Sequence, residues 1–168
     1  METCKIFWFP FWFEFYLKES KVYKLRFGFN CEMGLKVSKK NKLVEKLISA
    51  LRDFFSGKTW FLDIPHELKA SKFETKVLEE LRNIPPGEVI TYSELAKRIG
   101  NPLAVRAVGR ALAKNPLPLV YPCHRVVSKK DLRGFSQGLL LKQVLLYLEF
   151  GLNSDSKRHI FDKFLRFA

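Results

Sequence analysis

The sequence predicts a small α/β domain followed by a mostly α-helical domain that contains a helix-turn-helix. Three observations support this fold class. Short β-type runs and one amphipathic helix occupy the first third, periodicity fades around Pro65, and helical periodicity punctuated by Gly and Pro follows. With 168 residues, 47% of them hydrophobic, the chain can fill two small cores. We therefore place the domains at residues 1–66 and 67–168.

The N-terminal part predicts a small sheet with one helix. The segments FWFPFWFEFYL and KVYKLRFGF favour strands, and the charged segment KESK between them favours a turn. A helix that ends near Gly57 follows from the helical spacing of Leu43, Val44, Leu47, Ile48, Leu51, Phe54 and Phe55.

Two capping boxes mark helix starts in the C-terminal part. Ser71 with Glu74 opens a first helix, and Thr91 with Glu94 opens a second helix that runs through Arg98, after a short strand at EVIT. A Ser or Thr three residues before a Glu satisfies two helix N–H groups reciprocally, so these boundaries are local signals.

A third helix is expected in LAVRAVGRALAKN, with Asn101 as its N-cap and Pro102 at its first position, ending before Pro116. Together with the second helix it forms a helix-turn-helix over about residues 91–115. A last helix, Leu139–Phe150, is expected to stop at Gly151.

Charge favours a polyanionic partner. The chain has 30 Lys and Arg against 17 Asp and Glu, a net charge of +13, and residues 92–142 carry +8 of it. The third helix combines small residues with basic ones, a pattern that fits either close packing against another helix or approach to the minor groove of DNA, which is about 6 Å wide. Arg106 on this helix could then act as a wedge in the base stack.

Other classes of protein are disfavoured. No segment approaches membrane-spanning length, and no signal peptide is recognisable. The three cysteines form no CxxC pair and no zinc spacing, so we expect no metal and no cofactor, and a reducing cell interior. Whether Cys4 and Cys31 pair across strands stays open.

The segment YPCHRVV places a cysteine beside a histidine. A cysteine becomes a nucleophile at neutral pH when a base removes its proton, and His124 is placed to do this for Cys123. The imidazole needs an orienting acceptor. Glu149 is a candidate because it is the only acid in the apolar segment 139–150, although an exposed Glu near a helix end fits the pattern as well.

Three segments together resemble the O6-alkylguanine-DNA alkyltransferases. They are PPGEVITYSELAKRIGNPLAVRAVGRALAKNP, NPLPLVYPCHRVV and GFSQGLLLKQVLLYLE. The resemblance covers roughly residues 71–151. It implies a ribonuclease-H-like N-terminal domain, a winged helix-turn-helix C-terminal domain, and DNA repair by stoichiometric transfer of an alkyl group from O6-alkylguanine, and from O4-alkylthymine, to a cysteine. Such a methyltransferase is inactivated by a single turnover.

The resemblance also implies roles for individual residues. Cys123 is the acceptor, His124 the base acting through a water, and Glu149 the group that orients the imidazole. Asn115 ties the turn that presents the nucleophile, and Tyr92 donates a proton or a hydrogen bond to the leaving guanine. Val126, Phe135 and Ser136 line the pocket, Phe135 where many relatives have Tyr.

The partner implied is double-stranded DNA, bound through its minor groove by a monomer in the cytoplasm of a prokaryotic cell. Arg106 fills the stack after the damaged nucleotide flips. The positions that match family contacts to the DNA backbone are Tyr92, Ser93, Asn101 and Lys129. A lesion-binding protein of the alkyltransferase-like type is the alternative, although those proteins replace the cysteine that this chain keeps. A thiol hydrolase and a plain winged-helix regulator are weaker alternatives.

Overall fold

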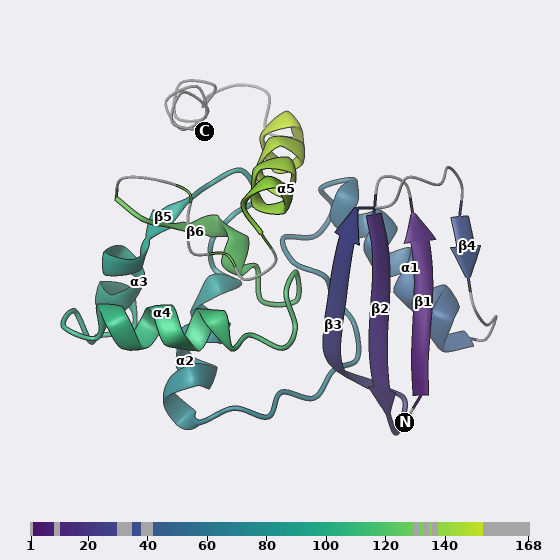
Figure 1. The fold of residues 1–168 in the computed structure, drawn as a ribbon, viewed down its shortest axis with the longest axis horizontal. Coiled ribbons are helices and arrows are strands. Elements are labelled where there is room, and N and C mark those ends of the chain that lie inside the picture. Colours follow the sequence, from purple (N-terminus) through teal and green to yellow (C-terminus); the bar gives the residue numbers. More distant parts are fainter. Residues whose placement is uncertain are drawn as a thin grey trace.

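A computed structural model describes residues 2–8, 11–29, 35–37, 42–129, 132, 135 and 138–152. A sheet domain and a helical domain lie side by side (Figure 1). Within the described residues, no helix is both long and apolar enough to cross a membrane.

The N-terminal domain is a four-stranded antiparallel sheet in the order β3-β2-β1-β4. Its strands are β1 (Glu2–Trp8), β2 (Phe11–Lys18), β3 (Lys21–Phe29) and β4 (Leu35–Val37). The segment FWFPFWFEFYL therefore contributes to two strands, β1 and β2. The predicted turn is a hairpin whose loop residues, Glu19 and Ser20, both have positive φ (49° and 61°), the geometry that matches strand twist.

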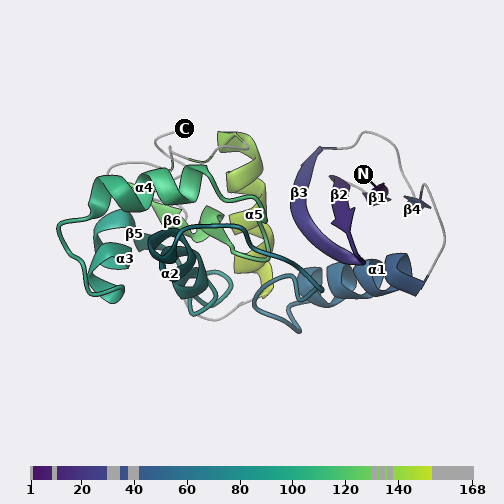
Figure 2. The ribbon, with the colours of Figure 1, turned by 90° about the horizontal axis from the view of Figure 1, so that it is seen from below.

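Helix α1 (Lys42–Phe55) lies across one face of this sheet (Figure 2). Strand β2 alternates buried and partly buried residues, so every second side chain enters the core. The ring of Phe11 stacks on that of Phe55 with 5.4 Å between centroids, which joins sheet and helix. The domain's core contains Phe11, Phe13, Phe15, Leu25, Phe27, Val44, Leu47, Leu51 and Phe54.

The segment between α1 and the next helix is irregular and runs along the free edge of β3. The N–H of Val22 donates to the carbonyl of Pro65, and its carbonyl accepts from Glu67, both at 2.9 Å. Farther along, the N–H of Leu25 donates to Pro116 O, also at 2.9 Å. The edge of the sheet therefore bonds to both the connecting segment and the C-terminal domain.

The C-terminal domain surrounds a short parallel pair of strands, β5 with β6. Its elements are α2 (Lys72–Leu81), β5 (Ile90–Thr91), α3 (Tyr92–Arg98), α4 (Val105–Ala113), the 3-10 helix η1 (Cys123–Arg125), β6 (Val126–Val127) and α5 (Leu139–Leu152). Both predicted capping boxes, at Ser71 and Thr91, are present with their reciprocal hydrogen bonds.

Two predicted helix boundaries are wrong. Helix α4 starts at Val105, because Asn101 and Pro102 belong to the preceding turn. The N–H of Asn101 donates to Ala96 O and that of Gly100 to Lys97 O, both at 2.9 Å. This Schellman pattern ends α3. Helix α5 continues through Gly151 to Leu152, since a glycine weakens a helix by only about 1 kcal/mol without forbidding it.

Candidate active site and nucleic-acid interface

Cys123 opens η1 at the end of an irregular loop that follows α4. Its side chain is buried, with 6% of its surface exposed. Asn115, just after α4, holds the loop: its Nδ2 donates to Tyr121 O at 2.8 Å and to Cys123 Sγ at 3.2 Å. Its Oδ1 accepts from Leu117 N–H at 3.0 Å. One amide therefore fixes both the loop and the sulfur.

The same loop is braced from the N-terminal side. Leu119 has a φ of +72°, which an L-residue adopts at a cost, and its carbonyl accepts from Leu62 N–H at 2.9 Å. The Tyr121 hydroxyl lies 3.0 Å from His66 Nε2 and 3.2 Å from Glu79 Oε1. Residues from both domains thus position the stretch immediately before the cysteine.

His124 is completely buried and bonds to helix α5. Its Nε2 lies 2.7 Å from Glu149 Oε1. A carboxylate only accepts hydrogen bonds, so Nε2 carries the proton and Nδ1 of the neutral ring has a lone pair. Among the described residues, Nδ1 has no hydrogen-bond partner although it is buried. The free nitrogen of this imidazole is therefore a base.

Arg125 is also fully buried and joins His124 in bonding to Glu149. Its Nε and Nη2 donate to Glu149 at 3.1 and 2.8 Å, and its Nη1 donates to Ile84 O at 2.6 Å. The backbone N–H of Gly87 lies 3.3 Å from Glu149 Oε2. This arrangement makes Arg125 a structural charge and excludes a contact of its side chain with phosphate.

Ionisation at the site follows from burial and charge. Burial opposes the charge on Glu149, but His124 and Arg125 outweigh burial and hold its pKa at about 2. Burial lowers the pKa of His124 below 6.5, against the pull of Glu149. Burial likewise raises the pKa of the Cys123 thiol, although the Asn115 hydrogen bond and the charge of Lys142 oppose the shift. At neutral pH the site contains a thiol, a neutral imidazole and a carboxylate.

Sequence reasoning missed Lys142 as a site residue. It is fully buried in α5, and its Nζ donates to Val126 O at 2.6 Å. The sequence does contain a signal for Lys142. It lies seven residues, or two helical turns, before Glu149 in a helix that is otherwise uncharged.

The predicted pocket residues lie beside this group where the structure describes them. Val126 is buried in β6. Phe135 meets the His124 ring edge-on at 6.4 Å between centroids. Ser136, like Cys31, lies outside the described residues.

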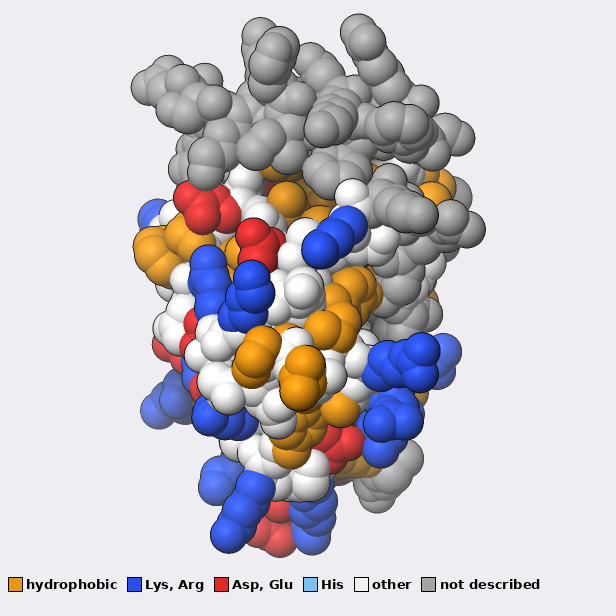
Figure 3. Space-filling view, turned by 90° about the vertical axis from the view of Figure 1, so that its left-hand side faces the viewer, with side chains coloured by type: hydrophobic (Ala, Val, Ile, Leu, Met, Phe, Trp, Pro, Cys, Tyr) orange, Lys and Arg blue, Asp and Glu red, His pale blue; other side chains and the backbone are white. Residues whose placement is uncertain are grey.

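Four of the five predicted DNA-contacting residues lie on a different surface, formed by α3, α4 and the turn between them. Arg106 and Asn101 are exposed, and Tyr92 and Ser93 are half-buried in the first turn of α3. Lys129 is exposed after β6. Figure 3 shows this end of the molecule, where hydrophobic side chains occupy the middle of the face and Lys and Arg border it.

The cations of this face differ in their partners. Lys114 pairs with Glu74 at 3.1 Å, and Arg98 approaches Glu80 at 3.9 Å. Arg106 and Arg110 have no ion pair with any residue that the structure describes, and both are exposed. These two guanidinium groups are therefore available to an anionic ligand.

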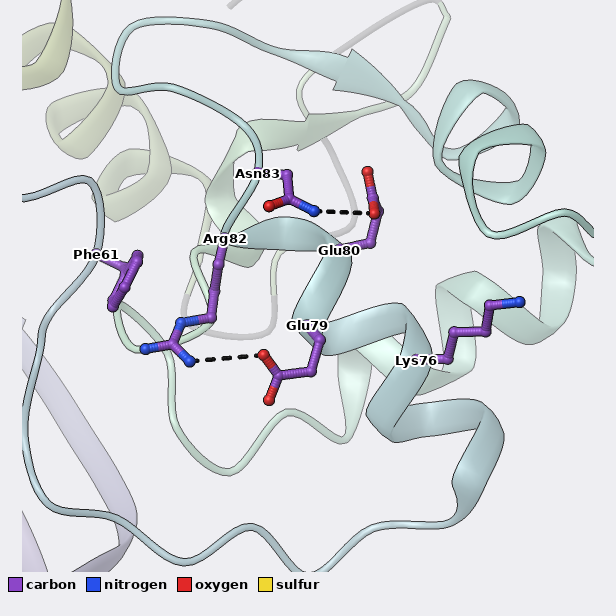
Figure 4. A pocket seen from close by; sticks show the side chains of 6 residues that line it. All are labelled: Phe61, Lys76, Glu79, Glu80, Arg82 and Asn83. Carbon is purple, nitrogen blue, oxygen red and sulfur yellow. Dashed lines mark hydrogen bonds and ion pairs between the residues drawn. The ribbon is translucent and has the colours of Figure 1, made fainter.

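A separate open pocket of about 520 Å³ lies at the end of α2 (Figure 4). The guanidinium of Arg82 stacks over the ring of Phe61 at 3.8 Å and pairs with Glu79 at 3.5 Å. The residues that line this pocket include no Cys, Ser, Thr or His. Within the described part of the chain, no three His, Cys, Asp or Glu side chains are placed to hold a metal.

Comparison with known proteins gives one consistent family. Residues 72–150 match the family model described as 6-O-methylguanine DNA methyltransferase, DNA binding domain. A probable methylated-DNA–protein-cysteine methyltransferase of Acanthamoeba polyphaga mimivirus is 43% identical over 113 residues, 67% of this chain and 76% of the relative. The methylated-DNA–protein-cysteine methyltransferase of Metallosphaera sedula is 46% identical over 107 residues, 63% and 67% of the two chains.

A solved structure extends the similarity to both domains. The crystal structure of Mycobacterium tuberculosis OGT in complex with DNA superposes with a TM-score of 0.71 at 28% identity. It covers 89% of this chain and 93% of that chain.

Proposed function

This chain belongs to the family of methylated-DNA–protein-cysteine methyltransferases, and we propose from this that it repairs DNA by transferring the alkyl group of O6-alkylguanine to Cys123. The observation that carries the proposal is the buried chain of Glu149, His124 and the cysteine loop, with His124 Nδ1 unpaired among the described residues. Because the product is a thioether, each molecule acts once.

The chemistry follows from the protonation states. Cys123 Sγ attacks the alkyl carbon, an S–C bond forms, and the C–O6 bond breaks with its electron pair going to guanine. The thiol proton passes to His124 Nδ1 through one water, and Tyr92 supplies a proton to the guanine. Glu149, ionised at neutral pH, stabilises the imidazolium that forms. Asn115 and Lys142 stabilise the developing thiolate, one by hydrogen bond and one by charge.

Binding of duplex DNA is assigned to α3, α4 and their turn. A base inside a duplex does not expose its O6 substituent to a buried cysteine, so the nucleotide must flip, and Arg106 takes its place in the stack. Val126, Phe135 and Ser136 receive the flipped base, while Ser93, Asn101 and Lys129 contact the backbone. Minor-groove binding suits repair, because readout there is degenerate and lesions occur in any sequence.

The proposal also includes the fold type of each domain, the domain boundary, the oligomeric state and the cellular location. A winged helix-turn-helix is supported by α3 and α4 with the β5–β6 pair beside them, and a ribonuclease-H-like first domain by the sheet with α1 on one face. The irregular segment between α1 and α2 supports a boundary at residue 66. Action on O4-alkylthymine, a monomeric state and a place in the prokaryotic cytoplasm are predictions.

Mass spectrometry tests the proposed function directly. After incubation with duplex DNA containing O6-methylguanine, the peptide that contains Cys123 gains one methyl group, while protein incubated with undamaged DNA stays unmodified. An unmodified peptide from protein that still binds the lesion would reject the transfer and favour the alkyltransferase-like alternative.

Arg106→Ala tests the flipping role. We expect repair in duplex DNA to slow far more than the reaction with a free alkylated guanine base, because only the duplex requires extrusion. Arg110→Ala on the same face is the matched control for lost charge. Equal losses on both substrates would contradict a role of Arg106 in flipping.

A further inference from the structure

Leu103 has the most exposed large hydrophobic side chain in the described part of the chain. It is 95% exposed, against 65% for the next, Tyr147. Burial of a leucine side chain is favourable, and Leu103 gains almost none of this stabilisation in the folded protein. A single exposed leucine is common in proteins, so any role for Leu103 has to be argued from its position in the fold.

The backbone that carries Leu103 is rigid. The turn from Gly100 to Ala104 is closed on one side by the Schellman pattern that ends α3. On the other side the N–H of Ala104 donates to Asn101 O at 3.0 Å. Gly100 has a φ of +74°, as this motif requires. The leucine is therefore presented on a fixed support.

Leu103 lies on the surface to which DNA binding is assigned. It precedes Arg106, one of the two unpaired guanidinium groups of α4, by three residues. Figure 3 shows the apolar side chains of this face in the middle and the cations at its borders. This is the distribution that suits a groove whose phosphates lie on its rims and whose sugars and base edges lie between them.

We propose that Leu103 enters the minor groove of bound DNA and packs against deoxyribose and base edges next to the nucleotide displaced by Arg106. Apolar side chains are used in this way by many proteins that bind and deform the minor groove. The inference rests on the proposed function for the identity of the ligand, but it concerns binding and not alkyl transfer. Leu103 is a positioning residue.

Salt dependence distinguishes this contact from a phosphate contact. Packing against sugars and bases releases no counterions, so its contribution is the same at low and high salt. A contact to a phosphate loses strength as salt rises, and its removal lowers the salt slope by about one.

The experiment measures the Kd for duplex DNA carrying O6-methylguanine at several salt concentrations, with binding kept separate from chemistry by replacing Cys123 with Ser in every variant. We expect Leu103→Ala, which removes three side-chain carbons, to weaken binding by roughly tenfold or more at every salt concentration. Arg110→Gln should weaken binding mainly at low salt.

Leu140→Ala is the matched control, because Leu140 is also exposed (63%) but lies in α5, away from the turn. Its Kd should equal that of the parent protein. An unchanged Kd for Leu103→Ala, or a loss that disappears at high salt, would overturn the proposal. If the unsubstituted protein, which keeps Cys123, is not methylated at that residue, the proposed function is rejected, and the binding comparison can still be interpreted.

Discussion

Arg125 and His124, neighbours in the chain, donate to the same oxygen, Oε1 of Glu149, at 2.8 and 2.7 Å inside the core. Removing either charge of the Arg125–Glu149 pair leaves the other buried without compensation. We therefore expect Glu149→Gln and Arg125→Met each to lower the free energy of unfolding by about 3–5 kcal/mol.

The double variant is the decisive measurement. Because it removes both charges, it should cost much less than the sum of the single variants in urea denaturation. Glu67→Gln, which breaks the exposed pair with Lys69 at 3.7 Å, is the control and should cost little. Additive losses at Arg125 and Glu149 would show that the pair is not coupled.

Stability should fall with acid in two stages. Burial lowers the pKa of His124 in the folded protein, so the unfolded chain binds more protons and stability is lost as pH falls below about 6.5. Below about pH 4.5 the unfolded chain also binds a proton at Glu149, whose pKa in the folded protein is about 2. The loss of stability therefore becomes steeper between about pH 4.5 and pH 2.

Unfolding free energies measured from pH 8 to pH 3 test this order. His124→Asn should remove most of the first stage, since it deletes the titrating imidazole, and should keep only part of the second, since Arg125 remains to lower the pKa of Glu149. A protein equally stable at pH 7 and pH 5 would contradict the assignment of a neutral buried His124.

Asn115→Asp should slow alkylation of Cys123 by about tenfold or more. A carboxylate cannot donate to Sγ or to Tyr121 O, and its charge raises the pKa of the nearby thiol further. Single-turnover rates with O6-methylguanine DNA, together with titration of the thiol, measure the effect. Asn83→Asp, an exposed change of the same kind on the C-terminal side of α2, should leave the rate unchanged.

Substitution of two glycines of the helix-turn-helix by alanine should change the free energy of unfolding in opposite directions. A Cβ on Gly109 would meet Tyr92 Cε1 at an ordinary 4.0 Å, so Gly109→Ala should raise unfolding free energy by about 0.5–1 kcal/mol. Gly100 has open space around it but a φ of +74°, so Gly100→Ala should cost about 1–2 kcal/mol. Thermal melts compare them, and a stabilised Gly100→Ala would refute the role given to the turn.

Local signals made part of this fold predictable. The capping boxes at Ser71 and Thr91 each need only four consecutive residues, and both predicted helix starts are present. The predicted start of α4 at Asn101 and Pro102 was wrong. Asn101 is a residue type that favours an N-cap, but its N–H bonds to Ala96 O and ends α3 instead.

The site residues likewise fall into those that local sequence suggests and those that only packing reveals. Cys123 and His124 are adjacent, so a local pattern suggested them, and Glu149 stood out as an acid in an apolar helix. Lys142 and the pairing of Arg125 depend on packing between α5 and η1, which lie far apart in the sequence. Both residues contribute to the positive charge counted for residues 92–142, and both are buried.

The hydrogen bonds that join the sheet domain to the cysteine loop at Leu25 and Leu62 use main-chain atoms on both sides. Any side chains that preserve an edge strand and its neighbouring segment can make these bonds. The first domain is thereby free to drift in sequence while it keeps its shape. The solved structure that covers 89% of this chain at 28% identity fits this expectation, because the shape is kept although most residues differ.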